Sequence, residues 1–192
     1  MRHWGFLPSP AELAAVTAAQ KAFRDRWESI RPPCSTTFDG TIQDVHALDY
    51  MDYEGIDFPL PGLEGSALVC GEVLRRAAGL EWVISYRGDW FVASREESSG
   101  PVAICPLARL HELECGEPPG GMKHLWFVQR AALECLLPCG PEREPMIREL
   151  LAGSGDYVAH LQNSLERSQN PSRSAEHGKQ GRRSPGKKKR YG

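Results

Sequence analysis

The clearest hydrophobic pattern lies near the start of the chain. Apolar side chains recur at three-, four- and seven-residue spacings, as on one face of a helix: Leu13, Val16, Phe23, Trp27 and Ile30. Just before them, Ser9-Pro10-Ala11-Glu12 supplies a capping serine, a proline suited to the first helical position and a glutamate that completes a capping box. This pattern predicts a helix from residue 10 that ends before Pro32-Pro33.

A second helical pattern covers residues 65–78, with Gly79 as its natural cap. Its apolar side holds Ala67, Cys70, Val73, Leu74 and Ala77. Residues 34–64, which precede it, show little regular pattern and are predicted to form a packed connection. Further helices are predicted at 107–113, 122–137, 145–152 and 156–166. For 122–137 the predicted apolar face consists of Met122, Leu125, Trp126, Leu133 and Leu136.

Aromatic and β-branched residues predict strands at 80–86 and 90–95, with a third strand at 101–105. Gly88-Asp89 suits a two-residue type II′ turn, which would pair Arg87 with Trp90 and Ile84 with Ala93. In that register one face is expected to form the core: Trp82, Ile84, Tyr86, Phe91 and Ala93. The mixed face would hold Val83, Ser85, Arg87, Trp90, Val92 and Ser94. Trp90 and Arg87 could stack there, either under a later helix or as an exposed interaction anchor.

These elements predict an α+β fold, in which helices pack on one face of a small antiparallel sheet. Residues 1–166 are expected to form a single domain. After Leu165 the only apolar residues are Ala175 and Tyr191. Residues 167–192 are therefore predicted to be a disordered tail, because so few apolar groups cannot offset the entropy lost on ordering.

Charge divides the chain at the same boundary. The chain has 23 Lys plus Arg and 25 Asp plus Glu, but nine of the basic residues and only one acidic residue lie in 167–192. The domain is therefore acidic and the tail basic. A run of cations near the end is typical of non-specific contact with nucleic-acid phosphates: Arg182, Arg183, Lys187, Lys188, Lys189 and Arg190.

Several function classes lack their sequence signals. The phosphate-binding and hydrolase motifs G-x-x-x-x-G-K-[ST], G-x-G-x-x-G, G-x-S-x-G and H-E-x-x-H are missing. No apolar run approaches the length of a membrane span. The first residues lack the apolar stretch of a signal peptide, so a reducing cytosol is the expected location.

An acidic run follows residue 48, comprising Asp49, Asp52, Glu54 and Asp57. Its spacing does not fit a calcium-binding EF-hand loop, because that alignment puts Tyr50 and Pro61 at positions that need carboxylates. We expect these side chains to lie in a solvated acidic loop and to contribute to a partner-binding surface.

Two enzymatic alternatives rest on cysteine chemistry. Zinc could be held by Cys115, His124, Cys135 and Cys139, although only Cys135 and Cys139 are closely spaced. A thiol nucleophile could be Cys105 with His111 or His46 as its base. Otherwise most of the six cysteines are expected to be reduced and structural, and no cofactor is required.

A set of local motifs spans about residues 65–115: Gly71-Glu72 on a helix, Gly79-x-x-Trp82 entering a strand, a hairpin, and Ile104-x-Pro106 before a helix. In these motifs the chain resembles small uncharacterised bacterial domains, some of which are similar to immunity proteins found beside toxins. The resemblance implies a non-enzymatic interaction protein and brings no catalytic residues. Together with the acidic domain, it predicts a protein-binding module whose partner is basic.

Overall fold

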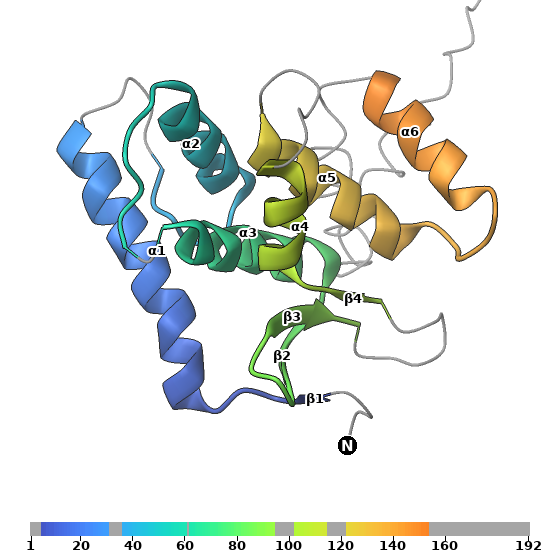
Figure 1. Ribbon diagram of the computed structural model, residues 1–192, viewed down its shortest axis with the longest axis horizontal. Helices are drawn as coiled ribbons and strands as arrows, with labels where there is room; N and C mark the ends of the chain where they lie inside the picture. The colour runs from blue at the N-terminus through green and yellow to red at the C-terminus, as the bar shows by residue number, and fades with distance from the viewer. Residues whose placement is uncertain (1–4, 31–35, 61, 95–101, 115–121, 154–192) are drawn as a thin grey trace, which may run out of the picture.

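The computed structural model describes residues 5–30, 36–60, 62–94, 102–114 and 122–153 (Figure 1). Its helices are α1 (Pro10–Ile30), α2 (Ile42–Tyr53), α3 (Leu63–Ala78), α4 (Pro106–Glu114), α5 (Lys123–Leu136) and α6 (Arg143–Gly153). Its strands form one antiparallel sheet in chain order: β1 (Gly5–Phe6), β2 (Glu81–Ser85), β3 (Trp90–Ala93) and β4 (Ala103–Ile104). The predicted α+β class is confirmed. The predictions for 156–166 and for the basic tail lie outside the described residues.

Helix α1 begins as its sequence predicts. The backbone N–H of Ser9 donates to Glu12 Oε2 at 2.7 Å, and the backbone N–H of Glu12 donates to Ser9 Oγ at 3.3 Å. These two bonds form a capping box, which satisfies two N–H groups that have no partner inside the helix. The buried face consists of Val16, Ala19, Phe23 and Trp27, whereas Leu13 at the first turns is 38% exposed.

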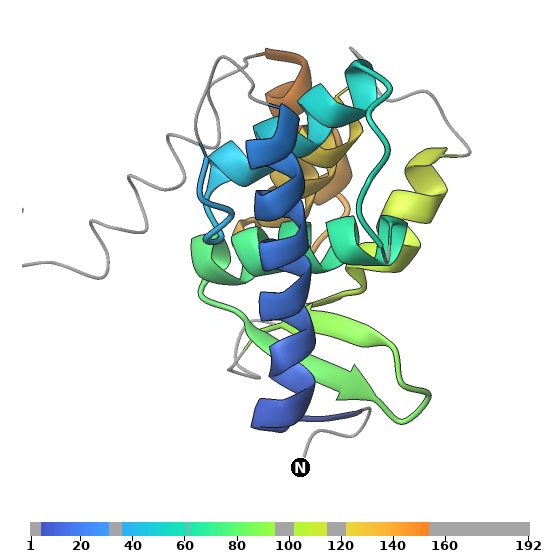
Figure 2. The ribbon, with the colours of Figure 1, turned by 90° about the vertical axis from the view of Figure 1, so that its left-hand side faces the viewer.

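Helix α3 is the centre of the molecule. It contacts α1, α2, α4, α5 and strand β3, and it lies between the sheet and helices α2 and α5, while α1 runs past both α3 and the sheet (Figures 1 and 2). It ends at Gly79, whose left-handed backbone (φ 65°, ψ 32°) is the conformation expected of a glycine cap. In the described ranges, no helix has both the length and the apolar character needed to cross a membrane.

The connection predicted at 34–64 is packed, with Phe38, Val45 and Leu48 fully buried, but it contains a helix, α2, so the predicted lack of regular structure was wrong. Two of the buried positions of α2 are aspartates, Asp44 and Asp49, and they interrupt the hydrophobic period that would have revealed the helix. Asp44 accepts the backbone N–H groups of Gly40 at 2.6 Å and Thr41 at 3.0 Å. Its carboxylate therefore stabilises the start of α2 by satisfying backbone donors at the first turn.

The hairpin between β2 and β3 has a different register from the predicted one. Ile84 pairs with Trp90 and Trp82 pairs with Val92. The loop is one residue longer than a two-residue turn: Ser85 donates its backbone N–H to Asp89 O, and Gly88, at φ 91°, donates to Ser85 O. Such three-residue loops with a left-handed glycine are common in hairpins.

The observed loop also begins two residues earlier than the predicted one, so Ile84 pairs with Trp90 and not with Ala93, a shift of three residues. An odd shift exchanges the two faces of a strand. Trp82, Ile84, Trp90 and Val92 therefore share one face, and Phe91 and Ala93 lie on the other. The hydroxyl of Ser85 supports the longer loop, because it accepts the backbone N–H groups of Arg87 and Asp89, each at 3.1 Å.

The face of α5 also differs from the predicted one. Met122 and Leu136, predicted to be buried, are 46% and 43% exposed. The helix contacts α2, α3, α4 and α6, so several sides of it are covered. Its buried residues are His124, Leu125, Phe127, Val128, Ala131, Ala132 and Leu133.

Candidate functional site

Glu72 on α3 joins the helix to the sheet. Its side chain accepts the indole N–H of Trp82 at 2.9 Å, two N–H groups of Arg75 at 2.8 Å and the Nε–H of Arg76 at 3.0 Å. Burial by itself would raise the pKa of Glu72, but the hydrogen bonds from Arg75 and Trp82 outweigh it, and the pKa lies below its usual value. The ionised carboxylate therefore fixes the orientation of the Trp82 ring.

Gly71 lets Trp82 pack directly on α3. A Cβ atom at this position would lie 2.2 Å from Trp82 Cη2 and 3.0 Å from Pro106 Cγ. Any side chain here would displace the indole ring, since real Cβ atoms do not make contacts that short. The Gly71-Glu72 pair thus places Trp82 by steric fit and by hydrogen bonding.

A pocket of about 270 Å³ lies between the hairpin, α3 and the start of α4, and we call it the hairpin pocket. Its walls are largely apolar and include Leu68, Trp82, Trp90 and Leu107. Two carboxylate residues, Glu64 of α3 and Asp89 of the hairpin loop, also line it, and both are exposed. A concave apolar site with a few polar groups has the usual composition of a binding pocket.

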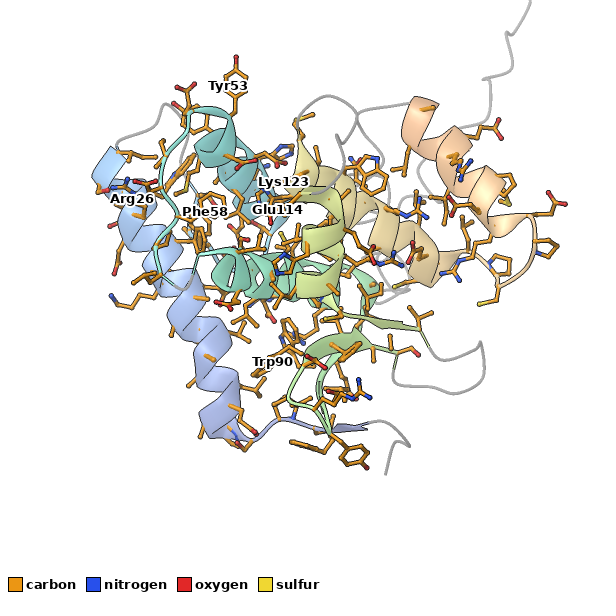
Figure 3. All side chains as sticks on the ribbon, viewed as in Figure 1. Arg26, Tyr53, Phe58, Trp90, Glu114 and Lys123 are labelled. Carbon is orange, nitrogen blue, oxygen red and sulfur yellow. The ribbon has the colours of Figure 1, made fainter. Side chains whose placement is uncertain are left out.

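The two tryptophans of the hairpin pocket pack against each other. Their ring centroids are 5.5 Å apart and their planes are inclined at 88°. Trp82 is 4% exposed, whereas Trp90 is only half-buried and lies between the hairpin and α3 (Figure 3). Trp90 is thus supported by the core and still accessible from the pocket.

Trp90 does not face Arg87 as the sequence predicted. Because Trp90 pairs with Ile84, it lies on the face that packs toward α3, and Arg87 is exposed in the loop. Arg87 is also not among the residues that line the hairpin pocket. The predicted Arg87–Trp90 stack is therefore replaced by the Trp82–Trp90 pair.

The four acidic residues predicted to lie in one solvated loop differ in secondary structure and exposure, because Asp49 and Asp52 belong to helix α2 and Asp49 is buried. Asp49 is 4% exposed inside α2, while Asp52 forms an ion pair with Lys123 at 3.2 Å. Glu54 and Asp57 are exposed. The prediction fails for Asp49, because this carboxylate has a structural role at the start of α5.

The carboxylate of Asp49 caps helix α5. It accepts the backbone N–H groups of His124 and Leu125, each at 2.9 Å, and lies 2.9 Å from Nδ1 of the His124 ring. Nε2 of His124 is buried and has no hydrogen-bond partner among the described residues. The contacts between Asp49 and His124 thus link α2 to α5.

The three predicted zinc ligands that the structure describes, His124, Cys135 and Cys139, do not converge on one point. His124 and Cys135 are 11 residues apart on the straight helix α5, a separation of about 16 Å along the axis, whereas two ligands of one zinc ion lie within about 5 Å of each other. Cys139 is exposed beyond the end of the helix, and Cys115 lies outside the described residues. Within the described ranges, no group of three or more potential ligands surrounds a common point.

Two of the described thiols, Cys70 and Cys135, lack the surroundings of a nucleophile. The four described cysteines, Cys70, Cys105, Cys135 and Cys139, are unpaired. Burial raises the pKa of Cys70 well above its usual value and that of Cys135 to about 12, which suppresses the thiolate. Among the described hydrogen bonds, none joins Cys105 to His46 or His111, and both histidines are exposed.

Sequence reasoning identified Trp90 but missed most of its pocket. The sequence places Leu68 and Leu107 in predicted helices, Glu64 in the predicted connection and Asp89 in a predicted turn, with no binding role for any of them. The signal was present at Gly71-Glu72 and Trp82, whose spacing marked a helix-to-strand contact. The predicted nucleic-acid-binding residues, 182–190, lie outside the described residues.

The chain was compared with protein-family models, curated proteins and solved structures, and none of them matched. The resemblance to bacterial immunity-like domains therefore stays a prediction from the motifs alone.

Proposed function

We propose that this protein is a non-enzymatic interaction module that binds a segment of another protein in the hairpin pocket. The observation that carries the proposal is the half-buried Trp90, held against Trp82 beside an apolar cavity of about 270 Å³. Tryptophans that are accessible and supported by a rigid core are typical anchors of protein interfaces. This volume suits one side chain of a partner better than a drug-sized ligand.

The chemistry of the pocket favours binding over catalysis. Its lining consists of aliphatic and aromatic groups, two exposed carboxylates and the thiol of Cys105. Catalysis by a thiol requires a base within hydrogen-bonding reach, and the described residues supply none to Cys105. A rigid apolar cavity needs no such partner to recognise a side chain.

The charge of the domain favours a basic partner. Residues 1–166 carry 14 basic and 24 acidic side chains. Such an excess attracts cationic proteins and speeds their association at low salt. An immunity-like role, in which an acidic protein blocks a basic toxin, is consistent with this charge and with the motifs of residues 65–115.

A peptide-display selection on the immobilised full-length protein tests the proposal. Wild-type protein should enrich peptides that no longer bind after Trp90→Ala, which removes a wall, or Leu107→Trp, which fills the cavity. Tyr86→Ala is the matched control, because Tyr86 lies in the same hairpin, is 67% exposed and does not line the pocket. Selected peptides that bind all four proteins equally would refute the pocket as the binding site.

The basic run of 182–190 supports a second candidate, a nucleic-acid accessory function. It predicts salt-sensitive binding of RNA or DNA that is lost when residues 167–192 are deleted. Binding of nucleic acid by the 1–166 fragment as well as by the full chain would exclude the tail as its source.

A further inference from the structure

The charged side chains that line the hairpin pocket indicate which kind of side chain would bind in it. Glu64 lies in the first turn of α3 and Asp89 at the end of the hairpin loop, so the two carboxylates reach the pocket from separate elements. The other lining residues include neither lysine nor arginine. No salt bridge of either carboxylate is found among the described residues, and the Asp89 carboxylate accepts a hydrogen bond from the Ser85 hydroxyl at 3.2 Å.

The walls below these carboxylates suit the stem of a long cationic side chain. Leu68, Leu107 and the half-buried ring of Trp90 offer an apolar surface on which methylene groups can lie. A cation near a tryptophan ring is also attracted by the electrons of the ring. A neutral aliphatic side chain would pack on the walls but give neither carboxylate an oppositely charged partner.

We infer that the occupant of the hairpin pocket is a lysine or arginine side chain of the partner, whose stem packs on Trp90 and whose charge meets Glu64 and Asp89. This inference rests on the proposed function and deepens it, because it names the residue type that the pocket recognises. It also names two of the acidic side chains of the domain, Glu64 and Asp89, as the groups that contact the basic partner.

The test compares two small probes that differ in charge and not in the length of their carbon chain. N-acetyl-lysine methylamide and N-acetyl-norleucine methylamide are titrated into full-length protein, and the indole N–H signal of Trp90 is followed by NMR. The lysine probe should bind about tenfold more tightly than the norleucine probe at low salt, and added salt should reduce the difference. Trp90→Phe identifies the signal.

The matched variant is Glu64→Gln/Asp89→Asn, which removes both charges and keeps the shape of the side chains. It should bind the two probes equally, while wild-type protein retains its preference. Equal binding of both probes by wild-type protein would overturn the inference and leave the proposed function standing. If neither probe moves the Trp90 signal, the inference fails; the proposed function fails with it only if the peptide selection also yields no pocket-dependent binder.

Discussion

The indole N–H of Trp82 donates to Glu72 Oε2 at 2.9 Å, and this bond ties the central helix to the sheet at a residue that lines the hairpin pocket. Glu72 also binds Arg75 and Arg76, so its carboxylate accepts hydrogen bonds from three side chains. Together with the close packing on Gly71, this contact fixes Trp82, against which Trp90 packs.

Glu72→Gln should lower the free energy of unfolding by about 2 kcal/mol at pH 7, because it replaces charge-assisted hydrogen bonds with neutral ones. Since the pKa of Glu72 is lowered in the folded protein, its contribution is complete above the usual glutamate pKa. The contribution is lost as the pH falls from about 5 through the lower, folded value. The stability difference between wild type and variant should shrink across that range, as measured by urea unfolding.

The control for this prediction is Glu112→Gln. Glu112 forms an exposed ion pair with Arg109 at 3.1 Å and should change stability by less than about 1 kcal/mol. A Glu72→Gln protein as stable as the control protein at neutral pH would show that the network contributes nothing measurable.

Gly71→Ala should destabilise the protein by about 1–3 kcal/mol, the usual effect of overpacking. In most helices this change stabilises, since alanine has the higher helix propensity. Here the new methyl group would lie 2.2 Å from Trp82 Cη2. Thermal unfolding provides the measurement. Gly140→Ala, which meets no atom within 4 Å, is the control and should be close to neutral; a stabilising Gly71→Ala would mean that Trp82 moves freely.

Asp49→Ala should lower the free energy of unfolding by about 3 kcal/mol, because it leaves two buried backbone N–H groups and the His124 ring without the Asp49 carboxylate. Asp52→Ala, one turn away on α2, removes only a partly exposed ion pair and should cost less than about 1 kcal/mol. Urea unfolding of the two variants measures the contrast. Equal costs would contradict the capping role of Asp49.

Thiol labelling should separate the cysteines at the end of α5. Cys139 is exposed and should react quickly with a maleimide or iodoacetamide. Cys135 should react at least tenfold more slowly under native conditions, because burial raises its pKa to about 12. Peptide-level mass spectrometry resolves the two sites. Similar rates would show that the end of α5 opens readily.

Much of the fold could be predicted from the sequence, for identifiable reasons. The period and capping box of α1 and the glycine that ends α3 are local signals, and both are confirmed. Helix α2 was missed because Asp44 and Asp49 are buried in capping contacts, and Asp49 acts on residues more than 70 positions away. A single sequence carries no sign of such a partner.

The hairpin pocket also could not be predicted from the sequence, because it depends on the length of one loop. Gly88 is compatible with two loop lengths, and the Ser85 hydroxyl supports the longer one, because it accepts the backbone N–H groups of Arg87 and Asp89. That choice decides whether Trp90 faces α3 or solvent. One residue in a turn therefore separates the predicted Arg87–Trp90 anchor from the observed Trp82–Trp90 pocket.

Whether the hairpin pocket binds a partner can be tested by a ¹⁹F NMR titration of protein labelled with 5-fluorotryptophan, using a peptide from the display selection. The signals of Trp82 and Trp90 should shift as the peptide fills the hairpin pocket. The signals of Trp27, which is 2% exposed beside Phe38, and of Trp126, which lies under Arg130, should stay in place. A bound peptide that leaves the Trp82 and Trp90 signals unmoved would contradict the hairpin pocket as the binding site.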